Sequence, residues 1–205
     1  MTNDFKEPFG YIHPKSTYIL GLDLNRRGKD STAFSILEQL PFNDPNIFLS
    51  YFEEHNYDVL TKAIDRVILL HAYFDFKKIY IDSTGLGSGV CDVLKQKISG
   101  GIVEEVMFTQ KSKAEMFWNL KLLMQQNKLK LPNYLANSNA LAKKLYFQLL
   151  AIRQEQDEND RLPKIYHDSK MHDDLVCSLA LAALYFNQRK SFKKSYGLYG
   201  NNPTI

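Results

Sequence analysis

The spacing of hydrophobic residues changes several times along the chain, and each change predicts a different element. Short apolar runs bounded by turn residues predict strands, and apolar residues three or four positions apart predict helices. Strands are expected at 16–25, 30–40, 46–55, 77–84 and 102–109. Helices are expected at 57–74, 88–98, 111–129, from about 138 onward, and at 173–189. Three strands followed by alternating helices and strands predict an α/β fold: a mixed five-stranded sheet flanked by helices.

Two further features complete the predicted organisation. A β-hairpin is expected near 147–166, with the acidic stretch 157–160 at its tip. Residues 1–17 are interpreted as a lead-in, 18–190 as one domain, and 191–205 as a flexible basic tail. In the helix predicted at 111–129, Trp118 has helical spacing with Leu122 and is expected in the core.

Composition narrows the class of protein. The 205 residues are 44% hydrophobic, which is enough to bury a core, and the net charge of +3 is compatible with a polyanionic partner. Cys91 and Cys177 lack CxxC spacing, so neither a disulfide framework nor a zinc cluster is expected. No apolar run approaches a membrane span and the N-terminus is too polar for a signal peptide, so we expect no membrane association and a cytoplasmic location.

The last predicted helix poses a question about charge. From Leu175 to Phe186 only Ser178 is clearly polar, which is typical of a helix buried on all sides. It nevertheless begins with adjacent aspartates, Asp173 and Asp174. Asp is rarely buried without a partner. A helix N-cap would explain one aspartate but not both.

Two predicted strands each carry one aspartate near the C-terminal end of an apolar run, Asp23 and Asp82. Either could be an ordinary strand-end residue bonded to loop amides. If the strands are neighbours, however, the side chains would lie roughly 5 Å apart and would repel unless a proton or a cation intervenes. With Asp173 and Asp174 added, a divalent cation is the simpler explanation. Oxygen ligands without His or Cys clusters favour Mg²⁺ or Mn²⁺.

Three segments resemble a known family in order and spacing: GLDLNRRGKDSTAFSIL, YIDSTGLGSGVCDVL and HDDLVCSLALA. They resemble the acidic motifs of the nuclease domain of phage terminase large subunits, and the stretch KSKAEMFWNLKLLMQQNKLKLP is similar to the segment between its second and third motifs. The resemblance covers residues 18–187 and implies a ribonuclease H-like fold that cuts double-stranded DNA during viral genome packaging.

The resemblance also implies roles for individual residues. Asp23 and Asp82 match the first two catalytic positions, Asp173 and Asp174 match the third, and Asp30 matches an accessory acidic residue. Two divalent ions are then expected, with Asp23 bridging both, Asp82 on one, and Asp173 or Asp174 on the other. Asp30 could equally form a plain turn.

The chain departs from the family pattern in two ways. Cys177 stands where the family often has another Asp. The phosphate loop GxxxxGK[ST] of the terminase ATPase motor is absent from this sequence. The expected partners are double-stranded DNA and, by resemblance, a terminase ATPase domain, the small terminase subunit and the portal, in the cytoplasm of the host cell.

Basic residues near the predicted site are candidates for DNA contact. Lys111 and Lys113 begin a helix, where amide groups and ammonium groups together suit a phosphate. Arg26, Arg27 and Lys29 form a basic turn close to Asp23. The alternative functions are a Holliday-junction resolvase or transposase-type nuclease, an actin-like ATPase, and a non-enzymatic DNA-binding packaging module.

Overall fold

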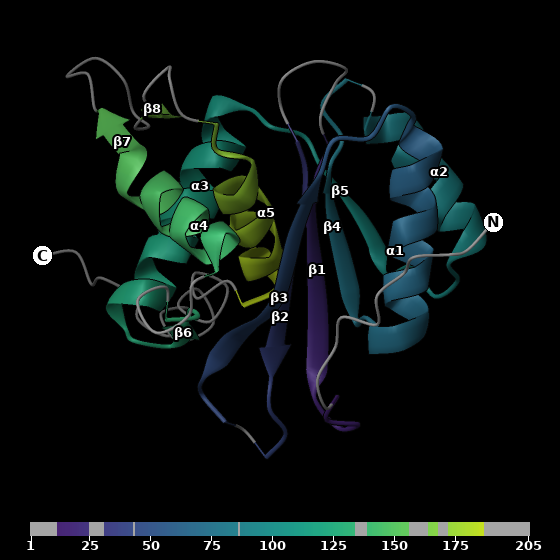
Figure 1. Ribbon diagram of the computed structural model, residues 1–205, viewed down its shortest axis with the longest axis horizontal. Coiled ribbons are helices and arrows are strands. Elements are labelled where there is room, and N and C mark those ends of the chain that lie inside the picture. The colour runs from purple at the N-terminus through teal and green to yellow at the C-terminus, as the bar shows by residue number, and fades with distance from the viewer. Residues whose placement is uncertain are drawn as a thin grey trace, which may run out of the picture.

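The computed structural model describes residues 12–24, 31–42, 44–85, 87–133, 139–155, 164–167 and 172–186. A central sheet separates two groups of helices, with α1 and α2 on one face and α3, α4 and α5 on the other (Figure 1). The strands of the sheet are β1 (Thr17–Asp23), β2 (Thr32–Gln39), β3 (Ile47–His55), β4 (Lys78–Asp82), β5 (Val103–Val106) and β6 (Leu129–Lys130). The helices are α1 (Leu60–Phe74), α2 (Gly87–Lys97), α3 (Gln110–Gln125), α4 (Ala140–Ala151) and α5 (Asp174–Ala183), which continues as a 3₁₀ turn, η1 (Leu184–Phe186).

The strand order is β5-β4-β1-β2-β3-β6. The three successive strands β1, β2 and β3 are antiparallel, whereas β4 and β5 run parallel to β1, and β6 runs parallel to β3. The predicted α/β class with a mixed sheet is therefore confirmed. The predicted number of five strands is wrong, because β6 is a sixth strand whose two residues are too short to produce a periodic signal.

The hairpin is present as the separate antiparallel pair β7 (Ile152–Glu155) and β8 (Lys164–His167). Its predicted start at 147 is too early, because α4 continues to Ala151 before the chain extends. The helix predicted over 173–189 is also shorter than expected, since regular α-helix ends at Ala183.

The two faces of the sheet bury separate cores. On β1, Ile19 packs with α3, α4 and α5, whereas Leu20 and Leu22 pack with α1 and α2. This alternation follows from the two-residue period of a strand. α5 lies between the sheet and the helices α3 and α4, and every residue from Leu175 to Ala183 is buried. Its all-round apolar surface is thus explained by its central position.

The one polar residue of that helix is satisfied internally. The hydroxyl of Ser178 lies 2.7 Å from the hydroxyl of Ser35 on β2, and it also donates to the carbonyl of Leu175 at 3.0 Å. A buried hydroxyl without such partners would be costly. Ser178 therefore fixes the register of α5 on the sheet.

Gly21 allows α5 to touch the backbone of β1. A Cβ atom at Gly21 would lie 2.0 Å from the carbonyl oxygen of Ser178 and 2.5 Å from the amide nitrogen of Ala182. Both neighbours are backbone atoms, so no side-chain rotation could relieve the overlap. The absence of a side chain at Gly21 is thus a condition for this helix–sheet contact.

Gly21→Ala should lower the free energy of unfolding by about 2 kcal/mol, because the added methyl forces α5 away from β1. Gly89→Ala is the matched control: nothing lies within 4 Å of a Cβ atom there, and alanine favours helix α2 by up to about 1 kcal/mol. Urea denaturation measures both. If the two variants were equally stable, the close seating of α5 on β1 would be incorrect.

The position of Trp118 differs from the one that its spacing along the sequence predicts. Trp118 is 37% exposed on α3, so its predicted place in the core is wrong; the buried face of α3 is formed by its neighbours Met116, Phe117 and Leu120.

Among the described residues, no helix is both long and apolar enough to cross a membrane.

Candidate active site

Two carboxylates meet where β1 and β4 end. The strands are parallel neighbours with Leu22 opposite Ile81, so the same register places Asp23 beside Asp82. Asp82 has the same strand parity as Tyr80, and Asp23 the same as Ile19, which puts both on the α5 face of the sheet. Asp82 is only 8% exposed. The predicted pairing of these aspartates at one edge is therefore confirmed.

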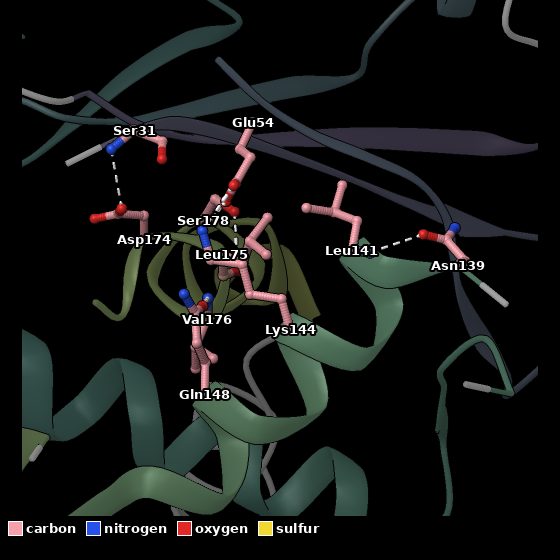
Figure 2. Close-up of polar contacts among 10 residues, drawn as sticks. All are labelled: Ser31, Glu54, Asn139, Leu141, Lys144, Gln148, Asp174, Leu175, Val176 and Ser178. Carbon is pink, nitrogen blue, oxygen red and sulfur yellow. Dashed lines mark hydrogen bonds and ion pairs between the residues drawn. The ribbon is translucent and has the colours of Figure 1, made fainter. Parts of the chain in front are cut away.

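α5 brings two more carboxylates to this edge. Asp173 occupies the N-cap position, but its side chain makes no capping hydrogen bond to the described amides of the helix. Its Oδ2 instead lies 3.6 Å from Nζ of Lys113 on α3. Asp174 accepts a hydrogen bond on Oδ2 from the amide of Ser31, at 3.1 Å, just before β2 (Figure 2). Capping thus fails as an explanation of Asp173.

A residue of α4 satisfies the first turn of α5 instead. Oε1 of Gln148 accepts from the amide of Val176 at 3.3 Å, as Figure 2 shows. The first amides of a helix need such acceptors from outside the helix. Gln148 thus serves one of these amides, and the carboxylate of Asp173 lies beside Lys113 instead.

Three of these carboxylates act electrostatically on the fourth, Asp23. The pKa of Asp23 is raised well above its usual range, first by burial and then by the negative charges of Asp174, Asp82 and Asp173. Lys113 opposes this shift. A buried carboxyl among like charges favours the protonated form unless a cation is supplied. Asp23 is therefore the centre of the cluster.

Lys113 is a positive group built into the cluster. Its ammonium lies next to Asp173 and 5.2 Å from the ring centroid of Phe108. Burial by itself acts to lower the pKa of Lys113, but the negative charges of Asp173 and Asp23 and the hydrogen bond to Asp173 outweigh it, and the pKa is raised. Lys113 therefore stays charged and partly balances the carboxylates.

Cys177 lies one helical turn after Asp173 and is 1% exposed. Burial raises the pKa of the thiol well above its usual range, and the charges of Asp23 and Asp173 raise it further. The sulfur is therefore held as a neutral thiol. A carboxylate at the same position would add a hard ligand and a further negative charge, neither of which this chain has.

The loop after β4 positions Asp82. Its Oδ1 accepts from the amide of Thr84 at 2.9 Å, so the expected strand-end bond to a loop amide does exist for this oxygen. The loop is tight because a Cβ atom at Gly87 would lie 2.0 Å from the carbonyl oxygen of Asp82. Glycine therefore lets α2 begin directly behind the site.

A fifth carboxylate in the same row is neutralised. Glu54 on β3 pairs with Ala33, which pairs with Asp23, so the three share one face of the sheet. Both oxygens of Glu54 lie 2.7 Å from Nζ of Lys144 on α4 (Figure 2). Lys144 thus neutralises the charge of Glu54, so we do not count Glu54 among the carboxylates of the cluster around Asp23.

The fold has known counterparts, although no protein-family model and no curated protein sequence matches the chain. The crystal structure of the large terminase nuclease from thermophilic phage G20c is 21% identical, with 83% of each chain covered and a TM-score of 0.64. The large terminase nuclease domain of bacterial virus Sf6, solved with manganese and beta-thujaplicinol, is 13% identical; 82% of this chain and 87% of that chain are covered, with a TM-score of 0.61. This is the fold of phage terminase nucleases.

The large terminase of bacteriophage HK97 shows the same fold inside a longer chain. It is 12% identical, and the match covers 85% of this chain and 40% of that one, with a TM-score of 0.58. The predicted ribonuclease H-like class and the likeness to terminase nuclease domains are therefore confirmed at the level of the fold.

On this terminase-nuclease fold the predicted site residues are distributed as follows. Asp23, Asp82, Asp173 and Asp174 come together at one edge of the sheet. Lys111 is exposed in the first turn of α3, two residues from Lys113. Asp30, Arg26, Arg27 and Lys29 lie outside the described residues, and their predicted roles stay predictions. The predicted DNA contacts of Lys111 and Lys113 stay predictions as well.

Sequence reasoning missed two residues that shape the site, Gln148 and Ser31. Gln148 is the one buried polar side chain among the described residues of α4, and a lone Gln on an apolar helical face was the available signal. Ser31 acts through its backbone amide, for which the amino-acid type gives no signal.

The cluster fits a hard divalent cation by its chemistry. Its possible metal ligands are carboxylate oxygens, which suit Mg²⁺ or Mn²⁺ rather than a soft metal. In the described part of the chain, no three His, Cys, Asp or Glu side chains are close enough together to hold an ion as they stand. Binding an ion there therefore requires these side chains to draw inward.

Proposed function

We propose that this protein is a metal-dependent endonuclease that cuts double-stranded DNA during viral genome packaging. The observation that carries the proposal is the cluster of Asp23 with three other carboxylates, Asp82 at the end of the neighbouring strand β4 and Asp173 and Asp174 at the start of α5. The likeness of the fold to phage terminase nucleases supports it. Such a cluster destabilises a protein by itself, and active sites commonly carry such a cost for function.

The proposed metal ligands are Asp23, Asp82 and one or both of Asp173 and Asp174. When bound there, two divalent ions supply charge neutralisation at the scissile phosphate and acidify the attacking water. The protein's part is positioning: Thr84 orients Asp82, Ser31 orients Asp174, and Lys113 holds Asp173. Terminase nuclease structures solved with zinc, manganese or calcium support a divalent metal, and the oxygen ligands of this site favour Mn²⁺ or Mg²⁺ among such metals.

Nicking of a supercoiled plasmid tests the proposal directly. Cutting should require Mg²⁺ or Mn²⁺, stop in excess chelator, and show little sequence preference. A four-way DNA junction offered beside duplex DNA separates a packaging nuclease from a junction resolvase. Undiminished cutting in chelator, or no cutting of any substrate with either metal, would contradict the proposed activity.

The proposed partners follow from the terminase context. In the HK97 large terminase the corresponding region is 40% of the chain. We propose that this domain works with a terminase ATPase domain, the small terminase subunit and the portal, in the cytoplasm of the host cell. Binding of purified small subunit or portal protein, measured by light scattering, tests each partnership separately.

Lys111 and the basic turn 26–29 are proposed to contact DNA phosphates. Lys111→Ala should weaken binding to all DNA sequences alike and reduce the slope of log affinity against log salt by about 1, since each phosphate contact releases about one counterion. Lys97→Ala, an exposed lysine of α2 across the sheet, is the control and should leave the slope unchanged. Lys113 is less suitable for this test, because its substitution also disturbs Asp173. An unchanged slope in Lys111→Ala would assign that lysine to the solvated surface.

A further inference from the structure

An apolar groove lies between α3, α4 and the β7–β8 hairpin, and the proposed nuclease reaction does not use it. It encloses about 450 Å³. From α3 it is lined by Phe117, Trp118, Lys121 and Met124, and from α4 by Leu149 and Leu150. This volume lies within the range of real ligand-binding clefts.

The groove leaves large apolar side chains in water. Trp118 is 37% exposed, Met124 39% and Leu150 55%, and all three line the same groove. Scattered apolar residues on a surface are normal, but several together on two neighbouring helices mark an interaction site. The groove therefore suits an apolar partner surface.

The length of the groove suits a short helix. Its lining residues on α3 recur from Ala114 to Gln125 with helical spacing, which is three turns or about 16 Å at 1.5 Å per residue. An amphipathic helix of similar length would present apolar anchors at the same interval. Laying such a helix into an apolar groove is a common mode of peptide recognition.

The two helices that line the groove are rich in lysine. Between Gln110 and Ala151 the chain has seven lysines, of which Lys113 and Lys144 pair with Asp173 and Glu54, and a single acidic residue, Glu115. Lys121 lines the groove itself. The ammonium of Lys121 lies 5.4 Å from the ring centroid of Trp118, and that of Lys143 lies 5.9 Å from the ring centroid of Phe147. Lys121 thus places a positive charge at the groove beside Trp118, and Lys143 places another on the exposed face of α4.

The positive charge of these helices favours an acidic occupant of the groove over a basic one. A second copy of the chain would bring the same lysine-rich face and be repelled. Residues 187–205 of this chain carry four basic residues and no acidic one, so they are equally mismatched. A helix with acidic residues beside its apolar anchors matches both the groove and its rim.

We propose that the groove between α3 and α4 binds a short amphipathic helix of a partner protein, with Leu-like anchors flanked by Asp or Glu. This inference is independent of the proposed nuclease activity. Trp118 is the only tryptophan in the 205 residues, so its fluorescence reports on the groove alone.

The experiment titrates the full chain, without metal or DNA, with synthetic peptides of about 14 residues, or ~21 Å as helix. One peptide has Leu anchors at helical spacing and Glu elsewhere; the second has Lys in place of Glu; the third has Glu but Ser anchors. None contains Trp or Tyr. The first should shift the Trp118 emission to shorter wavelength, and should bind at least about tenfold more tightly than the other two.

Variants of the chain locate the binding. Lys121→Glu should weaken the acidic peptide by about fivefold, the upper end for a surface ion pair, and Leu150→Ser by about tenfold. Lys97→Glu makes the same charge change on α2, across the sheet, and should have no effect. The proposal is overturned if no peptide shifts the emission, or if the Glu and Lys peptides bind equally. It is also overturned if the Ser-anchored peptide binds as well, or if emission changes with protein concentration alone, which would indicate a second copy.

Discussion

Asp23→Asn and Asp82→Asn should each reduce metal-dependent cutting of duplex DNA by at least about a hundredfold, since loss even of an outer-shell partner of a metal site costs up to that much. Asp23 lies at the centre of the four carboxylates, and Asp82 stands beside it at the end of the neighbouring strand. Asn keeps the shape of each side chain and its ability to accept a hydrogen bond, so the bond from Thr84 to residue 82 is preserved. The measurement is the initial rate of plasmid nicking in saturating Mg²⁺ and Mn²⁺.

Asp92→Asn is the matched control for this prediction. Asp92 is an exposed carboxylate on α2, on the other side of the sheet from α5. It should cut like the wild type, and circular dichroism should show the same fold for all three variants. Wild-type rates in Asp23→Asn or Asp82→Asn would mean that the reacting centre lies elsewhere.

Without metal, Asp23→Asn should melt above the wild type at neutral pH, and added Mn²⁺ should reverse this order. The charge on Asp23 is opposed by burial and by three neighbouring carboxylates, and Asn removes it. With metal, a ligand bound only by the native state stabilises it by about 2.7 kcal/mol at a hundredfold excess over Kd. The wild type should gain much of this stabilisation, and a variant lacking a ligand should gain less.

The difference in stability between Asp23→Asn and the wild type should depend on pH. The pKa of Asp23 is raised in the folded protein, so the folded state holds the proton more tightly than the unfolded state does. The resulting penalty is absent below the ordinary Asp pKa of about 4 and grows as pH rises above it. In chelator, the advantage of Asp23→Asn over the wild type should therefore shrink as the pH is lowered toward about 4.

The same melting curves distinguish Asp173 from Asp174. Asp174→Asn can still accept from the amide of Ser31, so it should behave like Asp82→Asn if Asp174 is a metal ligand. Asp173→Asn loses its ion pair with Lys113, which should offset the relief of repulsion by up to about 1 kcal/mol. Four variants with the same Mn²⁺ response as the wild type would show that the cluster is not a metal site.

Local pattern was sufficient for much of the fold. The two-residue period of a strand requires Leu20 and Leu22 to point to one face of β1 and Ile19, Gly21 and Asp23 to the other, as the structure has them. Side-chain direction in a strand is set by the period of the backbone, so it is written in the sequence itself. The same holds for the buried helix α5, whose apolar surface required cover on all sides.

The arrangement of the site depended on contacts between distant segments. The amide of Ser31 meets Asp174 across 143 residues, and Gln148 meets Val176 across 28. The sequence predicted that Lys113, at the start of a helix, contacts a DNA phosphate. The packing of α3 against α5 also places it beside Asp173, which the sequence did not indicate. The two residues of the sixth strand, β6, pair with β3, which lies more than seventy residues earlier in the chain.

The sequence by itself thus determined which carboxylates end up at strand and helix termini, because periodicity encodes which way each side chain points. Only the tertiary structure decided which groups neutralise, orient and separate them, and that Trp118 faces a groove rather than the core. The physical reason is that charge balance and hydrogen-bond satisfaction are properties of neighbours in space, which residue spacing along the chain does not specify.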